Sequence, residues 1–219
     1  MSLVMRSGFH WTTFDLTGQL PPGWHADVIA AAVDADVREF PRTPILSREA
    51  PEVSHIRRGR VEVDRVQDAL PWLYQLYRGD FLELARLAWA DKSVEPARDD
   101  RIGVVLNVQR GTTMRFECHV DSNPLTGLLF CTDHREGGEL VFAHDKDAAS
   151  VQAVERDCSA IRPHAGHLIF FDGREHPHYA RPLLSEPETR VVAVMNYYTE
   201  SWPESVRPPE LNRHRFGDA

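Results

Sequence analysis

The sequence predicts an α+β fold in which helices precede a set of short strands. Apolar residues recur at helical spacing in the first half of the chain. From about residue 102 onward, short β-branched runs are separated by Gly, Pro, Asp or Ser. Many short strands with turn signals are typical of a sandwich or barrel. Because the helices come first and do not alternate with the strands, we expect them to pack on one face of a sheet.

Two segments of the first half show the helical pattern. Residues 24–37 follow the turn Pro21-Pro22-Gly23, and residues 64–89 repeat apolar side chains every three or four positions. Gly79 is expected to separate two helices in the second segment. Residues 40–62 carry several prolines and many charges, which predicts a loop with a short strand near residues 61–63.

The second half contains eight strand candidates. They are residues 102–108, 113–120, 125–131, 139–143, 158–162, 166–171, 176–181 and 190–198. A chain of 219 residues is expected to form one domain. Within it we expect a helical N-terminal part of about residues 1–98, a strand-rich core of about 99–200 and a C-terminal tail of 201–219.

Charge and cysteine content restrict the function classes. The formal net charge of −8 disfavours nucleic acid and anionic membranes as partners. The three cysteines are odd in number and show no CxxC spacing, so a disulfide framework is not expected. The N-terminal residues 1–7 lack an extended apolar region, and no apolar stretch of about 18 residues occurs. These features predict a cytoplasmic protein without a signal peptide or transmembrane helix.

A metal-binding pattern lies in the second half. His119 and Asp121 are two residues apart, and in a strand such positions point to the same face. His-x-Asp together with a distant second histidine is the ligand set of a non-haem iron(II) site with open positions. His178 and His176 are the candidates for the second histidine. The same spacing in His25-Ala26-Asp27 lies in an expected helix, where the two side chains diverge, so we assign it no metal.

Further motifs follow in a fixed order. After His-x-Asp come Gly137-Gly138-Glu139-Leu140, a strand ending in Phe170-Phe171, His178 with Pro182 four residues later, and Arg190 at the start of an apolar strand. With these motifs, the segment from about Asn107 to Tyr198 resembles the catalytic core of the iron(II)- and 2-oxoglutarate-dependent oxygenases, closest to the prolyl-hydroxylase-like branch. The resemblance implies a double-stranded β-helix (jelly-roll) core. It also favours His178 as the distal metal ligand.

The resemblance implies that Arg190 binds the far carboxylate of 2-oxoglutarate. A guanidinium presents a planar fork that can donate two parallel hydrogen bonds to a carboxylate. Related enzymes often add a tyrosine hydroxyl on the strand after His-x-Asp, but the matching position here is Phe130. Thr132, Asn107 and Thr126 are the candidates to replace it, and the sequence does not choose among them.

Three further polar residues are candidates for contact with the substrate. Asn196 shares the face of Arg190 on the same expected strand, and Arg115 and Gln109 precede the His-x-Asp motif. Solvated strand faces or turn contacts are the alternative interpretation of all three.

The sequence therefore predicts a 2-oxoglutarate-dependent dioxygenase that acts as a hydroxylase. Its expected cofactors are iron(II), 2-oxoglutarate and O2, with ascorbate as a candidate reductant. A small molecule such as an amino acid is the favoured substrate, and a residue in a peptide or protein is the alternative. The competing hypothesis is a cupin-like metal-binding isomerase or binding protein without 2-oxoglutarate chemistry, which would have no use for a buried Arg190.

Overall fold

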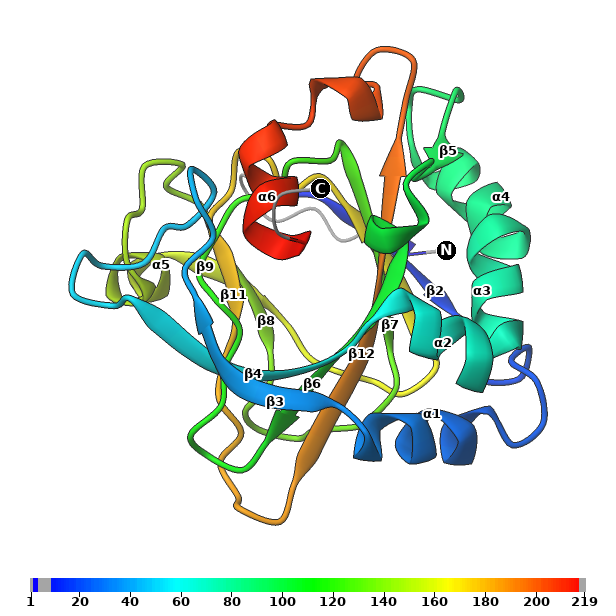
Figure 1. Ribbon diagram of the computed structural model, residues 1–219, viewed down its shortest axis with the longest axis horizontal. Coiled ribbons are helices and arrows are strands. Elements are labelled where there is room, and N and C mark those ends of the chain that lie inside the picture. Colours follow the sequence, from blue (N-terminus) through cyan, green and yellow to red (C-terminus); the bar gives the residue numbers. More distant parts are fainter. Residues whose placement is uncertain (1, 4–8, 217–219) are drawn as a thin grey trace.

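The computed structural model describes residues 2–3 and 9–216 (Figure 1). Residue 1, residues 4–8 and residues 217–219 lie outside the described residues, and with them most of the segment examined for a signal peptide. The helices are α1 (Trp24–Val33), α2 (Val63–Ala69), α3 (Pro71–Arg78), α4 (Asp80–Ala88), α5 (Val151–Arg156) and α6 (Pro209–Phe216), with short 3-10 turns η1 (Asp100–Ile102) and η2 (Glu204–Val206).

Two antiparallel sheets form the centre of the molecule. The strands are β1 (Ser2–Leu3), β2 (Trp11–Asp15), β3 (Asp36–Pro41), β4 (His55–Val61), β5 (Glu95–Pro96), β6 (Val104–Arg110), β7 (Leu125–Phe130), β8 (Leu140–Ala143), β9 (Cys158–Ile161), β10 (His167–Phe171), β11 (His178–Ala180) and β12 (Thr189–Tyr198). Among the described residues, the larger sheet has nine strands in the order β1-β2-β10-β7-β12-β6-β4-β3, with β5 paired to β12. The smaller sheet has the order β11-β8-β9.

The two faces of the larger sheet pack against different layers. Along β12, the odd-numbered residues from Val191 to Tyr197 pack against buried side chains of α1 to α4. Val192 faces the other way and packs with residues of β8 and β9 from the smaller sheet. Figure 1 shows α1 to α4 gathered along one side of the molecule and β8, β9 and β11 on the opposite side. The predicted α+β class, with N-terminal helices on one face of a jelly-roll core, is confirmed.

Most of the predicted elements are present, and three differ. Residues 36–41 overlap the end of the predicted helix and the start of the predicted loop, and residues 55–61 lie within that loop. They form the antiparallel pair β3 and β4, and β4 extends the larger sheet through β6. The N-terminal part therefore supplies strands as well as helices. Residues 113–120 form no continuous strand, and His119 makes only isolated bridges to Ser47 and His178. The C-terminal tail contains η2 and α6.

Two further findings concern the cysteines and the helices. Cys118, Cys131 and Cys158 are all free thiols, as the absence of a disulfide framework predicted. Within the described residues, each helix is too short or too polar to cross a bilayer.

Candidate active site

The three predicted metal ligands converge between the two sheets. One donor atom from each of His119, Asp121 and His178 lies within 4.8 Å of the others. The Nε2 atoms of His119 and His178 are 3.5 Å and 3.6 Å from Oδ1 of Asp121. Reciprocal backbone hydrogen bonds between His119 and His178, of 3.0 Å and 2.9 Å, hold the two histidines side by side. Two imidazoles and a carboxylate on one face form the facial triad of non-haem iron(II) sites.

Backbone carbonyls set the orientation of both imidazoles. Nδ1 of His119 lies 2.7 Å from the carbonyl oxygen of Glu117, and Nδ1 of His178 lies 2.9 Å from that of His176. A carbonyl oxygen only accepts, so Nδ1 carries the hydrogen in each ring and Nε2 is left free to bind a metal. His176 directs its own Nδ1 to the carbonyl of Ala143, 2.8 Å away, and stands outside the triad.

The carboxylate of Asp121 is fixed by its neighbours. The hydroxyl of Thr126 donates to Oδ2 over 2.7 Å, and Asn123 donates in turn to Thr126. Burial opposes the ionisation of Asp121, but the charge of His178 and hydrogen bonds from both histidines hold its pKa well below the usual range. The ionised form is the one that binds a metal.

Gly173 leaves space beside the triad. A Cβ atom at this position would lie 2.4 Å from Oδ2 of Asp121 and 2.7 Å from Cε1 of His178. The backbone carbonyl of Gly173 also accepts the amide hydrogen of Asp121 over 3.0 Å. The chain thus approaches the carboxylate more closely than any side chain would permit.

Arg190 is buried, and its guanidinium keeps unused hydrogen-bond donors. Its side chain is 1% exposed, and Nη1 donates to Oε1 of Gln109 over 3.0 Å. Within the described residues, Nε and Nη2 have no partner. Burial lowers the pKa of Arg190 to about 10. A buried guanidinium without an anion is costly, so this position is suited to a carboxylate ligand.

One cavity joins the triad to Arg190. Its polar lining is His119, Asp121, His178, Arg190, Thr126 and Asn107, and its apolar lining includes Phe116, Leu128 and Val192. Oδ1 of Asn107 is buried there without a partner among the described residues. The cavity therefore has two imidazoles and a carboxylate at one end and a buried guanidinium at the other.

The sequence of this region matches a known family. A family model described as the 2OG-Fe(II) oxygenase superfamily matches residues 104–198. This segment belongs to that superfamily. The predicted use of iron(II), 2-oxoglutarate and O2 is confirmed at the level of the family. No curated protein is significantly similar to the sequence.

Solved structures share the fold of the whole chain. AviO1 from Streptomyces viridochromogenes Tue57 is 18% identical, with 90% of this chain and 92% of that chain covered and a TM-score of 0.59. HygX from Streptomyces hygroscopicus, solved with nickel and 2-oxoglutarate bound, is 12% identical, with 88% and 84% covered and a TM-score of 0.58. SnoN, a non-heme alpha ketoglutarate dependent epimerase from nogalamycin biosynthesis, is 13% identical, with 88% and 78% covered and a TM-score of 0.57.

The structure separates the candidates for the second carboxylate contact in the oxygenase core. Asn107 lines the cavity and keeps a free amide oxygen. The hydroxyl of Thr132 accepts the backbone hydrogen of Val191 and contacts Nε2 of His134, so it is used by the strand itself. Thr126 is used by Asp121. Asn107 is the candidate whose polar group remains available to a ligand.

The three predicted substrate contacts have partners elsewhere. Arg115 forms a bidentate ion pair with Glu49. Gln109 is fully buried and spans from Arg190 to backbone carbonyls, including that of Arg181 at 2.9 Å. The amide of Asn196 donates to the carbonyl of Ile102. None of the three is among the residues that line the cavity.

Several contributors to the site were not predicted from the sequence in the roles that they have in the structure. Thr126 and Gly173 act on Asp121, and the rings of Phe142 and Phe171 pack against His178 with centroid distances of 4.8 Å and 5.7 Å. A glycine two residues after a Phe-rich strand looks like an ordinary turn residue. The role of Gly173 depends on how closely its backbone approaches the side chain of Asp121, which is distant in the sequence.

Proposed function

We propose that this oxygenase core hydroxylates an unactivated C–H bond of a small organic molecule and converts 2-oxoglutarate to succinate and CO2. The observation that supports this proposal is the shared cavity. The His119–Asp121–His178 triad lies at one end, and a buried guanidinium with two free N–H groups lies at the other. A residue in a peptide or protein is the alternative substrate.

Each part of the cavity has a defined task in this proposal. His119, Asp121 and His178 would hold iron(II), which supplies the activation of O2 when bound. Nε and Nη2 of Arg190 would donate to the far carboxylate of 2-oxoglutarate, and Gln109 keeps the guanidinium in place. Asn107 would add a hydrogen bond, because its amide can be turned to donate. Phe142 and Phe171 keep water away from His178.

The buried arginine also argues against the cupin-like alternative. A metal-binding isomerase or binding protein without 2-oxoglutarate has no carboxylate for the free donors of Arg190. Such a protein would bear the cost of a buried, unpaired charge without a compensating ligand.

Fold relatives support a small-molecule substrate. HygX has been solved with hygromycin B, and SnoN with alpha ketoglutarate and a nogalamycin compound. The narrow apolar wall of the cavity, with Leu128, Val192 and Val194, is suited to an aliphatic group next to the metal.

The test begins with anaerobic titration of the purified protein with iron(II) and then 2-oxoglutarate. We expect a weak visible charge-transfer band in the wild type. Arg190→Met should weaken 2-oxoglutarate binding by at least about 100-fold, because each hydrogen bond to a charged group contributes about 1.5–3 kcal/mol. Arg162→Met, at an exposed arginine of the same core, is the matched control and should bind normally.

Product analysis then distinguishes the reactions. Under O2, succinate release and a product that gains one oxygen atom from labelled O2 support hydroxylation. Loss of two hydrogens would indicate desaturation, and inversion at carbon without added oxygen would indicate epimerisation. No charge-transfer band and no succinate with the wild type would overturn the proposal.

A further inference from the structure

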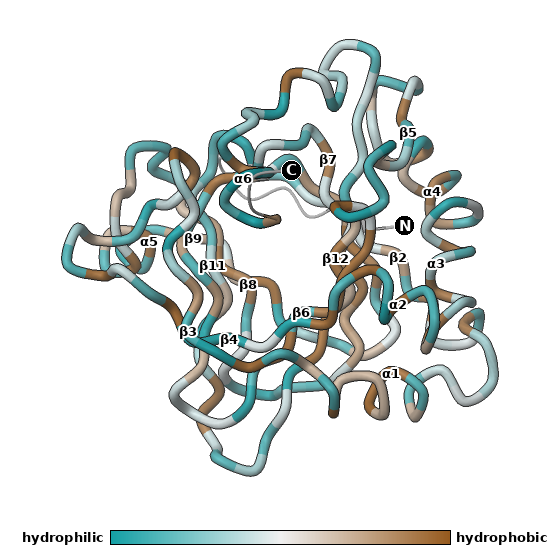
Figure 2. The backbone as a smooth tube through the Cα atoms, in the orientation of Figure 1, coloured by the Kyte–Doolittle hydropathy of each residue, from teal (hydrophilic) through white to brown (hydrophobic). Residues whose placement is uncertain are grey.

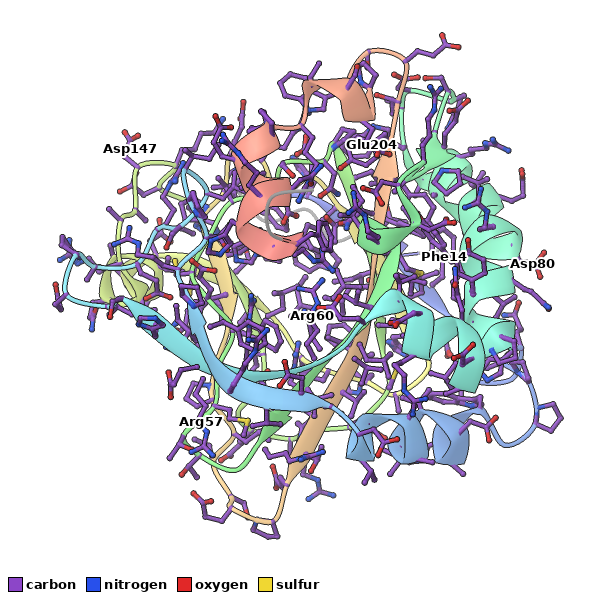
Figure 3. All side chains as sticks on the ribbon, in the orientation of Figure 1. Phe14, Arg57, Arg60, Asp80, Asp147 and Glu204 are labelled. Carbon is purple, nitrogen blue, oxygen red and sulfur yellow. The ribbon has the colours of Figure 1, made fainter. Side chains whose placement is uncertain are left out.

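On strand β4, the side chain of Arg60 projects toward the metal cavity. Arg60 is paired with Asn107 of β6, and paired residues in an antiparallel sheet project from the same face. Asn107 lines the cavity, so Arg60 stands next to its wall. The Arg60 side chain is only 13% exposed. Figure 3 shows Arg60 toward the centre of the molecule, whereas Arg57 of the same strand lies at the outside.

Arg58 reaches the same wall through aromatic contacts. Its guanidinium lies 4.8 Å from the ring centroid of Phe40 and 5.5 Å from that of Phe116, and Phe116 lines the metal cavity. Its Nε has no hydrogen-bond partner within the described part of the chain. Burial, with a contribution from the charge of Arg60, lowers the pKa of Arg58 to about 10. Arg58 is thus a partly buried cation that packs against two aromatic rings.

The C-terminal segment brings a third guanidinium. Arg207 donates to Oγ of Ser122 over 2.6 Å, and Ser122 directly follows the metal ligand Asp121. Arg207 also donates to Oδ1 of Asn212, so both contacts are with neutral groups. Burial lowers the pKa of Arg60, and the charge of Arg207 contributes to the same shift. Arg207 therefore lies near both the metal site and Arg60.

Two carboxylates, those of Glu62 and Glu117, act on the arginines of this region. Glu62 is shared by Arg60, at 2.9 Å, and by Arg215, at 3.0 Å. The carboxylate of Glu117 acts on Arg58, but it already accepts hydrogen bonds of 2.6 Å and 2.7 Å from Thr43. In a chain with a net charge of −8, Arg58, Arg60 and Arg207 thus gather as partly buried guanidinium groups beside the cavity. Such groups are stable when an anion joins them.

We propose that Arg58, Arg60 and Arg207 form a subsite for an anionic group of the substrate. The substrate would be a small organic anion, with its carboxylate or phosphate held by these guanidiniums while an aliphatic carbon faces the metal. This inference rests on the proposed function and adds the substrate class. The anion subsite is separate from Arg190, which is reserved for 2-oxoglutarate.

The test uses the protein loaded with nickel(II) and saturating 2-oxoglutarate, so that the metal and Arg190 are occupied. The melting temperature is measured with millimolar inorganic phosphate, hexanoate or hexanamide at constant ionic strength. We expect phosphate, hexanoate or both to raise the melting temperature, with no effect of the neutral amide. A response to phosphate alone, or to hexanoate alone, identifies which anion the subsite accepts.

Substitutions assign the response to residues. Arg58→Gln and Arg60→Gln should each reduce the anion-induced shift at least threefold, whereas Arg57→Gln, at an exposed position of β4, should keep it. Arg207 lies on the C-terminal segment, outside the sheet. Arg207→Gln should reduce the anion-induced shift by the same factor, and it supplies the test if either β4 variant fails to fold. Equal shifts with hexanamide, or an unchanged shift in the folded variants, would overturn the subsite.

Failure of the subsite and failure of the proposed function are distinguishable. If the metal-loaded wild type does not bind 2-oxoglutarate in the first step, the oxygenase proposal fails. If it binds 2-oxoglutarate but no anion changes its melting temperature, only the subsite fails.

Discussion

At the scale of single residues, Gly173 is the position where one added carbon should have the largest effect on the metal site. Gly173→Ala places a Cβ 2.4 Å from Oδ2 of Asp121 and 2.7 Å from Cε1 of His178, so the triad must shift. Displacing residues that orient metal ligands typically costs about 10–100-fold in affinity. We expect at least about tenfold weaker iron(II) binding, measured by anaerobic titration.

The control for this prediction is Gly18→Ala. An added Cβ at Gly18 meets no atom within 4 Å, so its iron(II) affinity should equal that of the wild type. Circular dichroism of both variants checks that the fold is retained. Wild-type affinity in a folded Gly173→Ala variant would mean that iron(II) binds elsewhere.

Residue identity predicted that His119, Asp121 and His178 would come together, but not the partners of other polar residues. His119, Asp121 and His178 were chosen because their side chains are metal donors in a known order. Arg115 was expected near the substrate, yet it pairs with Glu49, which is 66 residues away in the chain. Such pairings depend on the three-dimensional approach of distant segments, and no local pattern in the sequence encodes them.

At the scale of elements, helices α1 to α4 were predicted, whereas α5, α6 and β4 were missed. Helices on the outer face show an apolar stripe at regular spacing, which is readable from the sequence. In β4, two positions on the face that Asn107 occupies in β6 carry Arg58 and Arg60 in place of apolar residues. Figure 2 shows β3 and β4 as largely hydrophilic, in contrast to β12. A strand that lies beside a polar site can therefore have the composition of a loop.

Helix α3 should contribute stability without affecting the chemistry. Leu73 is fully buried between the helices and the outer face of the larger sheet. Leu73→Ala should lower the free energy of unfolding by about 2–5 kcal/mol, as for other buried leucines. Urea denaturation measures this loss, and iron(II) affinity should stay unchanged because the triad lies on the other face.

Leu87→Ala in α4 is the matched control. Leu87 is 60% exposed, so its truncation should change the unfolding free energy by no more than about 0.5 kcal/mol. Loss of iron(II) binding in a folded Leu73→Ala variant would show that the helical layer and the metal site are coupled.

At the scale of the whole molecule, the stability gained from metal binding should depend on pH. In the metal-free protein, burial alone would lower the pKa of His119, but the hydrogen bond and charge of Asp121 raise it above 6.5. A raised folded-state pKa stabilises the metal-free fold below about pH 6.5, and this contribution is lost as the pH rises through the folded pKa. The metal requires the unprotonated imidazole, so binding must expel this proton.

We therefore expect metal affinity to increase with pH. The apparent dissociation constant for iron(II) should fall by about tenfold per pH unit from about pH 6 up to the pKa of His119, and then level off. The difference in melting temperature between metal-loaded and metal-free protein should accordingly be smaller at about pH 6 than at about pH 8. Anaerobic titration and thermal unfolding at both pH values measure the two quantities, with the exposed His164→Gln variant as a control for general titration effects. A dissociation constant that does not change with pH would mean that no histidine proton competes with the metal, which contradicts the triad as the binding site.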